Sequence, residues 1–482
     1  MSLGIYIQVP FCQTKCTYCN FHTGVVSRDR YQPYAEAVCR DIATSAVSPA
    51  VGSASSNANS GANSDAKLGC AASGATGTAA SSLASPAVSS AASFSASSAV
   101  GSAVTSAASS AVSSAVDSAS CLGGRSFSSD MKPPRPSGVS TPEANDPVSS
   151  VVDTVYFGGG TPSLLDPAAL ETILNTLRAT HATQLAEVTL EADPETITPQ
   201  RASAWLAAGF NRVSLGSQSF DDRELQAAGR MHRRADIFRA AELLRAAGFR
   251  NISMDLIAGL PHQTRQSWEE SVARLLRIRP EHISIYMLEI DEGSRLGRES
   301  LAGGNRYSAA AIPDDDAMAE FYESAGAHLA SAGYDHYEIS NWGLPGRRSR
   351  HNLKYWRREP YLGFGAGAHS FDGATRWANV HDSARYVSLI EQGTSPREQI
   401  EAVTPDQAFE EEFFLGLRQL EGIDFARIER DYKSLFASRL ETVRRRIDDL
   451  RAEGFLQAEG SRIRIAPDRL AVSSEVFSQL LV

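Results

Sequence analysis

Long apolar runs are missing from this 482-residue sequence. A membrane-spanning helix needs about 20 mostly apolar residues, and no run approaching that length is present. The first residues, MSLGIYIQVPFC, also lack the basic stretch and the apolar core of a secretory signal peptide. We therefore expect a cytoplasmic protein without a transmembrane segment.

Positive charge is in deficit, because 46 Lys and Arg face 56 Asp and Glu, for a formal net charge of −10. Nucleic acids are bound by clustered Lys and Arg, so this balance argues against nucleic acid as a partner. Cysteine is scarce, at six residues. Disulfides are rare in the cytoplasm, so the close group Cys12, Cys16 and Cys19 predicts a metal or cluster site.

Large apolar side chains are sparse between residues 45 and 150, where Ala, Ser, Gly and Val dominate. Such a composition buries too little apolar surface to offset the entropy of ordering the chain. We interpret 45–150 as a low-complexity, disordered insertion without chemistry, in which Cys70 and Cys121 are free thiols. A transient Ala-rich helix is the alternative.

The remaining sequence alternates short β-rich runs with helical patterns, which indicates an α/β fold with a parallel sheet and helices outside. Six such units are fewer than the eight of a closed barrel, so residues 1–44 and 151–340 predict a partial (β/α)6 barrel. The expected strands are 5–9, 154–157, 187–191, 212–216, 252–257 and 282–288, and the clearest helices are 31–43, 167–180, 235–247 and 266–278.

The pattern changes after residue 340. Residues 341–400 are expected to form a connecting region, which contains the sequence HNLKYW. Helical runs at 405–420, 425–432 and 437–453 and a final hairpin then predict a mainly helical, winged-helix-like domain over 401–482. Many such modules bind DNA, but the acidic chain favours packing against a partner.

The three clustered cysteines have the spacing C-x3-C-x2-C and directly follow a strand. Three thiolates hold three irons of a [4Fe–4S] cluster and leave the fourth iron open to a small molecule with an amine and a carboxylate. S-adenosylmethionine (SAM) has both groups, and its reductive cleavage gives a 5′-deoxyadenosyl radical. A zinc site with His22 as the fourth ligand and three incidental thiols are the alternatives.

The cysteine spacing resembles that of the radical SAM superfamily, and Tyr6 followed by VPFC resembles its coproporphyrinogen-oxidase-like branch. The resemblance covers the chain outside the insertion. It implies SAM contacts that follow successive strands, although each alone fits a turn glycine, a strand-end charge, a surface arginine or a helix cap. The implied contacts are Tyr6, Tyr18, Gly159, Gly160, Thr161, Glu191, Gln218, Arg230 and Asp255.

This branch contains oxygen-independent coproporphyrinogen III dehydrogenases and HemW-type heme chaperones. Phe21 stands where the dehydrogenases characteristically have a further cysteine, and only five residues precede Tyr6, whereas the dehydrogenases carry a longer extension. His351-Asn352-x2-Tyr355-Trp356 matches the HN-x2-YW pattern of the chaperones. We therefore expect a heme chaperone, with the dehydrogenase as the alternative and a module with a structural cluster or zinc as a third reading.

The resemblance implies heme, acceptor hemoproteins and an electron donor as partners, and it leaves transient membrane contact open. A neutral imidazole is a common heme ligand, so His351 is the predicted axial ligand, with Tyr355 and Trp356 over the porphyrin. His22 and His369 are alternative ligands, and a histidine packed beside aromatics is the plainer reading of His351. Catalytic residues are not assigned. The arginines predicted to meet propionates are Arg347, Arg348 and Arg350.

Overall fold

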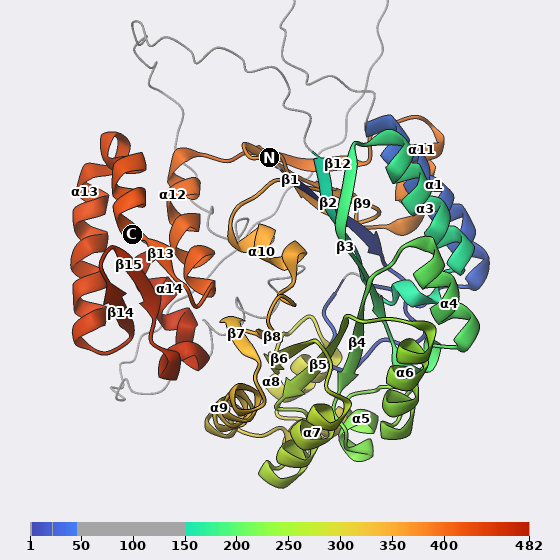
Figure 1. Ribbon diagram of the computed structural model, residues 1–482, viewed down its shortest axis with the longest axis horizontal. Helices are drawn as coiled ribbons and strands as arrows, with labels where there is room; N and C mark the ends of the chain where they lie inside the picture. The colour runs from blue at the N-terminus through green and yellow to red at the C-terminus, as the bar shows by residue number, and fades with distance from the viewer. Residues whose placement is uncertain (1, 22, 46–150, 482) are drawn as a thin grey trace, which may run out of the picture.

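The computed structural model describes residues 2–21, 23–45 and 151–481. The predicted insertion, including Cys70 and Cys121, lies outside the described residues apart from its first residue. In the described part, six consecutive strands run parallel, each beside the next, and they coincide with the six predicted strands (Figure 1). They are β1 (Ser2–Val9), β2 (Val151–Gly159), β3 (Thr183–Ala192), β4 (Arg212–Gln218), β5 (Ile252–Ala258) and β6 (His282–Met287).

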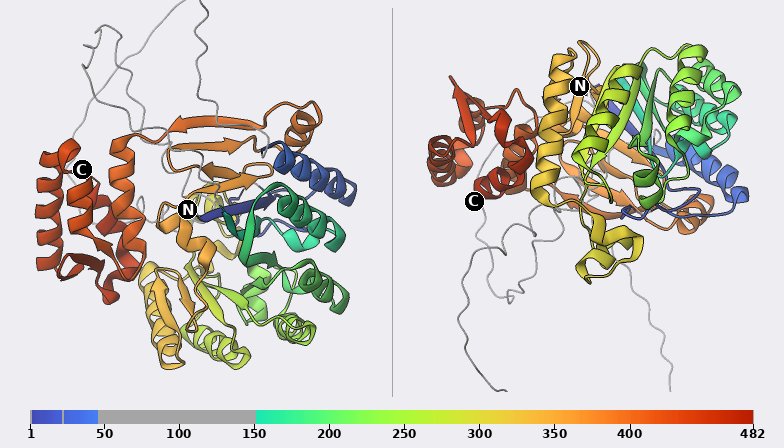
Figure 2. Two further views of the ribbon diagram at one scale, coloured as in Figure 1. Left: turned by 45° about the horizontal axis from the view of Figure 1, so that its top comes forward. Right: turned by 90° about the horizontal axis from the view of Figure 1, so that it is seen from below.

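Helices cover the outer face of these strands (Figure 1 and Figure 2). Asp166, Thr198 and Thr264 begin three of them, because each side chain accepts a backbone N–H of the first turn. Their inward faces are apolar, and Trp205 and Trp268 are completely buried. The helices are α1 (Tyr31–Ser45), α3 (Pro167–Thr180), α4 (Pro199–Ala208), α5 (Asp222–Ala227), α6 (Arg234–Ala247), α7 (Arg265–Ile278) and α9 (Asp315–Ser331). A further helix, α8 (Arg295–Leu301), lies instead beside the cysteine loop, where Leu296 donates its N–H to the carbonyl of Thr17.

The sheet forms a partial barrel and is not closed, as predicted. Its described strands number twelve, in the order β12-β11-β10-β9-β1-β2-β3-β4-β5-β6-β8-β7. Residues 341–400, expected only as a connection, add strands to both sides of the barrel. β8 (Asn341–Gly343) pairs with β6, and β9 (Tyr361–Phe364) pairs with β1. The same region also forms β10 (His369–Phe371), β11 (Thr375–Asn379) and β12 (Arg397–Ala402), with α11 (Ser383–Glu391) between the last two. β7 (Asp335–Glu338) comes just before this region and pairs with β8.

A short helix, α10 (Arg350–Trp356), lies between the β9 side and the β7–β8 side of the sheet (Figure 1). Its first turn is held by the buried Glu187 of β3, whose carboxylate accepts the backbone N–H groups of Arg350 and His351 at 3.0 Å each. The free N–H groups at a helix N-terminus favour a negative charge there. This pairing fixes α10 against the inner face of the sheet.

The C-terminal domain is mainly helical, as predicted. Its described residues include a small antiparallel sheet of three strands, in the order β13-β15-β14. The helices expected at 425–432 and 437–453 form one long helix, α13 (Phe425–Ala452), with a kink at Phe436. The other elements are α12 (Pro405–Phe414), β13 (Ile423–Asp424), β14 (Leu456–Glu459), β15 (Arg462–Ile465) and α14 (Ser473–Leu480).

The C-terminal domain is joined to the barrel beside α10. Gln419 forms an isolated β-bridge with Glu338 of β7, and Ile339 donates its backbone N–H to the carbonyl of Arg418 at 3.0 Å. The Arg418 guanidinium lies over the ring of Trp356 of α10, 4.5 Å from its centre. Among the residues that the structure describes, no helix is long and apolar enough to cross a membrane.

We expect Glu187→Ala to lower the free energy of unfolding by about 3–5 kcal/mol. The substitution removes a buried carboxylate that interacts with the backbone N–H groups of α10 and with the nearby buried guanidinium of Arg212. Thermal and urea unfolding measure the loss. The matched control is Glu171→Ala, which removes an exposed carboxylate on α3. If the two variants were equally stable, Glu187 would not hold α10.

Candidate cofactor site

The cysteine loop follows β1 and is held at the carboxyl ends of the strands. Its two ends meet, because Gly24 donates its N–H to Pro10 O at 2.9 Å and Cys12 donates to Gly24 O at 3.1 Å. The backbone of Thr17, in the middle of the loop, makes two hydrogen bonds to other segments. Its N–H donates to Ala228 O at 3.0 Å, and its carbonyl accepts from the N–H of Leu296 at 2.8 Å. The loop therefore presents its cysteines from a fixed position.

Cys12, Cys16 and Cys19 line the same cavity and form no disulfide. Burial raises the pKa of Cys12 to about 11 and also raises the pKa of Cys19, so without a cation these groups stay as thiols. Bound iron stabilises thiolates, so the donor set fits an iron–sulfur cluster. His22 lies outside the described residues. Within residues 2–21, 23–45 and 151–481, no three His, Cys, Asp or Glu side chains gather as a single-ion site.

The glycines after β2 pack against the start of the cysteine loop. Gly160 donates its N–H to Val9 O at 2.8 Å, and Thr161 donates to Phe11 O at 2.7 Å. A Cβ atom on Gly160 would lie 2.5 Å from the Phe11 carbonyl oxygen, so only glycine fits. Gly159, at φ +107°, donates its N–H to the carboxylate of Glu191 at 3.1 Å. These glycines position the loop and a carboxylate, besides leaving room for a ligand.

Two buried carboxyl groups line the cavity. Glu191 accepts from Tyr156 Oη at 2.8 Å, and burial raises its pKa to about 7, helped by the charge of Asp255. Burial also raises the pKa of Asp255 to about 6, against the opposing hydrogen bond from Ser284. A ligand that brings positive charge or hydrogen-bond donors favours the ionised form of both groups. The cavity therefore suits a cationic ligand.

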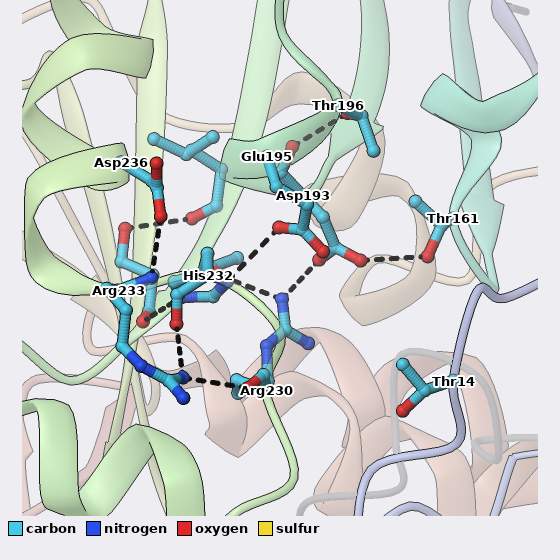
Figure 3. Close-up of polar contacts among 12 residues, drawn as sticks. Thr14, Thr161, Asp193, Glu195, Thr196, Arg230, His232, Arg233 and Asp236 are labelled. Atoms are coloured by element: carbon cyan, nitrogen blue, oxygen red, sulfur yellow. Dashed lines mark hydrogen bonds and ion pairs between the residues drawn. The ribbon is translucent and has the colours of Figure 1, made fainter.

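Arg230 lies between the cysteine loop and a third carboxylate (Figure 3). Its guanidinium pairs with Asp193, donates to the carbonyl of Gly216 at 3.1 Å and contacts Cys16 Sγ at 3.5 Å. The Thr161 hydroxyl donates to the other oxygen of Asp193 at 3.0 Å. A ligand carboxylate that meets Arg230 therefore meets a guanidinium already oriented by Asp193.

The predicted SAM contacts from the other strands reach the same cavity. Gln218, the last residue of β4, has φ +63°, a conformation that non-glycine residues adopt mainly where surrounding structure imposes it. The ring of Tyr6 is stacked with that of Tyr156, with centres 6.0 Å apart. Together the cavity-lining residues include Tyr6, Tyr18, Gly159, Gly160, Thr161, Glu191, Gln218, Arg230 and Asp255, with Cys12, Cys16 and Cys19.

The predicted heme residues lie beside this cavity and do not line it. His351 is 1% exposed; its Nδ1 is 2.9 Å from the hydroxyl of Thr154, and its Nε2 is 2.9 Å from that of Tyr355. Burial lowers its pKa to about 3, so the ring is neutral, and it stacks with Tyr156 at 5.3 Å. In this conformation both ring nitrogens are occupied. Trp356 is buried beneath the guanidinium of Arg418.

Sequence reasoning missed several residues of the cavity wall, and three of them matter most for the geometry of the site. Asp193 orients Arg230, Tyr156 donates to Glu191, and Asn352 lines the cavity from α10. Strand alternation provides a signal for the first two, because Tyr156 lies two positions before the glycine segment and Asp193 lies two positions after Glu191. Asn352 comes from a helix distant in sequence, so no local pattern places it there.

Two family models match the chain. The Radical SAM superfamily model matches residues 146–275, and the HemN C-terminal domain model matches residues 403–468. The first match begins within the last residues of the predicted insertion, at residue 146, and so does not include the cysteine loop. The structure of coproporphyrinogen III oxidase (HemN) from Escherichia coli has the same fold, with a TM-score of 0.68, 18% identity and coverage of 99% of this chain and 90% of that one.

Curated relatives match over most of their own length. Heme chaperone HemW of Bacillus subtilis is 34% identical over 330 residues, which cover 68% of this chain and 85% of the relative. Heme chaperone HemW of Mycobacterium tuberculosis is 36% identical over 331 residues, with 68% and 81% covered. A bovine mitochondrial radical S-adenosyl methionine domain-containing protein is 35% identical over 343 residues, with 68% and 76% covered. The chain therefore belongs to the radical SAM superfamily and, within it, to the HemW heme chaperone family.

Proposed function

We propose that this protein binds a [4Fe–4S] cluster, SAM and heme, and that it delivers heme to acceptor hemoproteins. The observation that carries the cofactor part is the meeting, in one cavity, of three cysteines from one loop with Arg230, Glu191 and Asp255 from three different strands or their following turns. The heme part is supported by the names of the HemW relatives and by the HN-x2-YW sequence on α10.

Each cavity residue has a role that follows from its chemistry. Arg230 binds the SAM carboxylate through its forked N–H groups, and Glu191 accepts from the amine. Asp255 and Gln218 hold the ribose hydroxyls. Cys12, Cys16 and Cys19 hold the cluster, which, when reduced by an electron donor, supplies the electron that cleaves the sulfonium.

The region around α10 has the chemistry for heme. His351 is neutral, which is the form that binds iron, but one ring nitrogen must exchange its hydrogen bond, with Thr154 or with Tyr355, for the metal. Arg347, Arg348 and Arg350 are exposed just before and at the start of α10, where propionates can reach them. We infer that Tyr355 and Trp356 contact heme when α10 loosens.

The coproporphyrinogen III dehydrogenase reading is the second candidate. The shared fold with HemN is compatible with it, but at 18% identity this likeness concerns the fold alone. Phe21 occupies the position after the cluster cysteines where a further cysteine marks the dehydrogenases. Because that difference lies in the cysteine loop itself, we favour the chaperone.

We expect Cys16→Ala to lose most of its iron after anaerobic reconstitution, because one of the three cluster ligands is removed. Iron and sulfide content and the absorbance change on adding SAM measure the effect. Cys39→Ala is the control, since Cys39 lies half-buried on α1 and outside the cavity, and it should keep both signals. Zinc in place of iron in the wild type would reject the cluster.

SAM binding should strengthen as the pH rises from 6 to 8. In the free protein the pKa of Glu191 is about 7 and that of Asp255 about 6. Both pKa values are higher than those of ordinary carboxyl groups, and the ligand favours the ionised forms. Binding of SAM therefore releases protons when the pH is below these pKa values. If both groups are ionised in the complex, the dissociation constant should fall roughly 20-fold between pH 6 and pH 8.

Equilibrium binding of SAM to the reconstituted protein measures this dependence. Glu191→Gln should bind SAM more weakly and keep only the roughly twofold dependence that comes from Asp255. A dissociation constant that is flat with pH in the wild type would show that the ligand does not favour ionised Glu191 and Asp255.

Heme titration tests the carrier function. Wild-type protein should bind heme and transfer it to apo-hemoproteins, and His351→Ala should shift the Soret band and weaken binding if His351 is the ligand. Unchanged affinity and spectrum would reject this ligand and leave His351 as a packing residue. Incubation with coproporphyrinogen III, SAM and a reductant is the parallel assay, and rapid decarboxylation without heme transfer would favour the dehydrogenase.

A further inference from the structure

One polar group in the cavity wall is buried without a hydrogen bond. Asn352 of α10 is 6% exposed and lines the cavity, and its Oδ1 has no hydrogen-bond partner among the described residues. Its backbone N–H is satisfied by Ser349 Oγ at 3.3 Å. A buried acceptor without a partner costs about 1–3 kcal/mol, so such groups usually face a ligand or an ordered water.

Three carboxyl groups of the wall already accept hydrogen bonds within the protein. Glu191 accepts from Tyr156 and Gly159, Asp193 from Thr161 and Arg230, and Asp255 from Ser214 at 3.5 Å. Arg212 also lines the cavity, and its Nε is buried without a hydrogen bond to the described residues. Among the fully buried side-chain atoms of the described wall residues, one acceptor, Asn352 Oδ1, and one donor, Arg212 Nε, have no hydrogen bond.

The charge of the cavity limits what these atoms can bind. Glu191 and Asp255 are acidic side chains that line the same cavity, so they would repel a further anion. The parallel rings of Tyr6 and Tyr156 provide a flat apolar surface. A neutral, planar group with adjacent donor and acceptor atoms fits these conditions. The amino-substituted edge of adenine is such a group, and the side-chain amide of Asn pairs with it through two hydrogen bonds.

α10 lies in the part of the barrel that the adenine end of SAM would reach. The cysteine loop and Arg230 take the amino-acid end at the carboxyl ends of the strands. Arg212 pairs in register with Thr189, two residues before Glu191, so it lies deeper in the barrel than the proposed amine contact. A SAM molecule anchored at the loop extends its nucleoside away from the loop and into the barrel.

We propose that Asn352 recognises the adenine of SAM, with Oδ1 accepting from the 6-amino group and Nδ2 donating to the adjacent ring nitrogen. This inference rests on the proposed function, because it requires SAM in the cavity. It assigns the Asn of the HN-x2-YW sequence to the nucleotide, while its neighbour His351 faces the ring stack.

Asn352→Leu tests the contact with little change in side-chain shape. Replacing an unpaired buried amide by an apolar side chain should leave the melting temperature of the reconstituted protein unchanged or higher. Loss of two hydrogen bonds to the base should weaken SAM binding about 10-fold or more. Asn251→Leu is the matched control: Asn251 also has an unpaired buried Oδ1 but lies outside the cavity, and its SAM affinity should equal that of the wild type.

A second probe keeps the proposal testable even where the variant folds poorly. The SAM analogue with oxygen in place of the 6-amino group should bind wild-type protein about 10-fold more weakly than SAM, and Asn352→Leu should bind the two equally. Wild-type protein that does not distinguish them would overturn the proposal. So would Asn352→Leu with wild-type SAM affinity, which would mean that Oδ1 faces only water. Wild-type protein with iron but no SAM binding would instead count against the proposed function.

Discussion

The structure depends on the buried carboxylate of Glu187 at the N-terminus of α10. A partial barrel of parallel strands leaves part of its interior without a neighbouring strand, and here α10 lies against that interior. Glu187 satisfies the first N–H groups of the helix and lies near the buried guanidinium of Arg212. With the helix fixed, His351 stacks on Tyr156, and Tyr156 in turn donates to Glu191. A contact far from the cysteines thereby orients a residue of the cofactor site.

Burial gives the cavity its electrostatic character. Desolvation raises the pKa of Glu191 to about 7 and that of Asp255 to about 6, so these two carboxyl groups are only partly ionised near neutral pH. A cation changes this balance by favouring both charges. Arg230 differs, because Asp193 keeps its charge paired before any ligand arrives. The charges of the cavity wall therefore suit a molecule that carries a carboxylate with a positive charge beside it.

Much of this arrangement is readable from the sequence. The six parallel strands follow from β-rich runs alternating with amphipathic helices, and the cysteine spacing identifies the loop. The residues expected to contact SAM all line one cavity, because the carboxyl ends of parallel strands share one end of the barrel.

Other features depend on contacts that no local pattern encodes. The strands in 341–400 are three to six residues long and pair with distant parts of the chain, so they resemble a connection in sequence. Asn352 reaches the cavity because Glu187, more than 160 residues away, fixes its helix. The HN-x2-YW resemblance implies a heme ligand at His351, whereas the structure gives its ring two hydrogen bonds that sequence cannot reveal.

The junctions at Ser45 and Val151 have a practical consequence. Ser45 ends α1 and Val151 begins β2, so both lie at the amino ends of the strands, opposite the cysteine loop. The entropy of closing a loop rises slowly with length, by about 0.6 kcal/mol per doubling, so a long segment is tolerated at such a site. A reporter domain could be attached at the same position, because it would lie at the opposite end of the strands from the cofactor cavity.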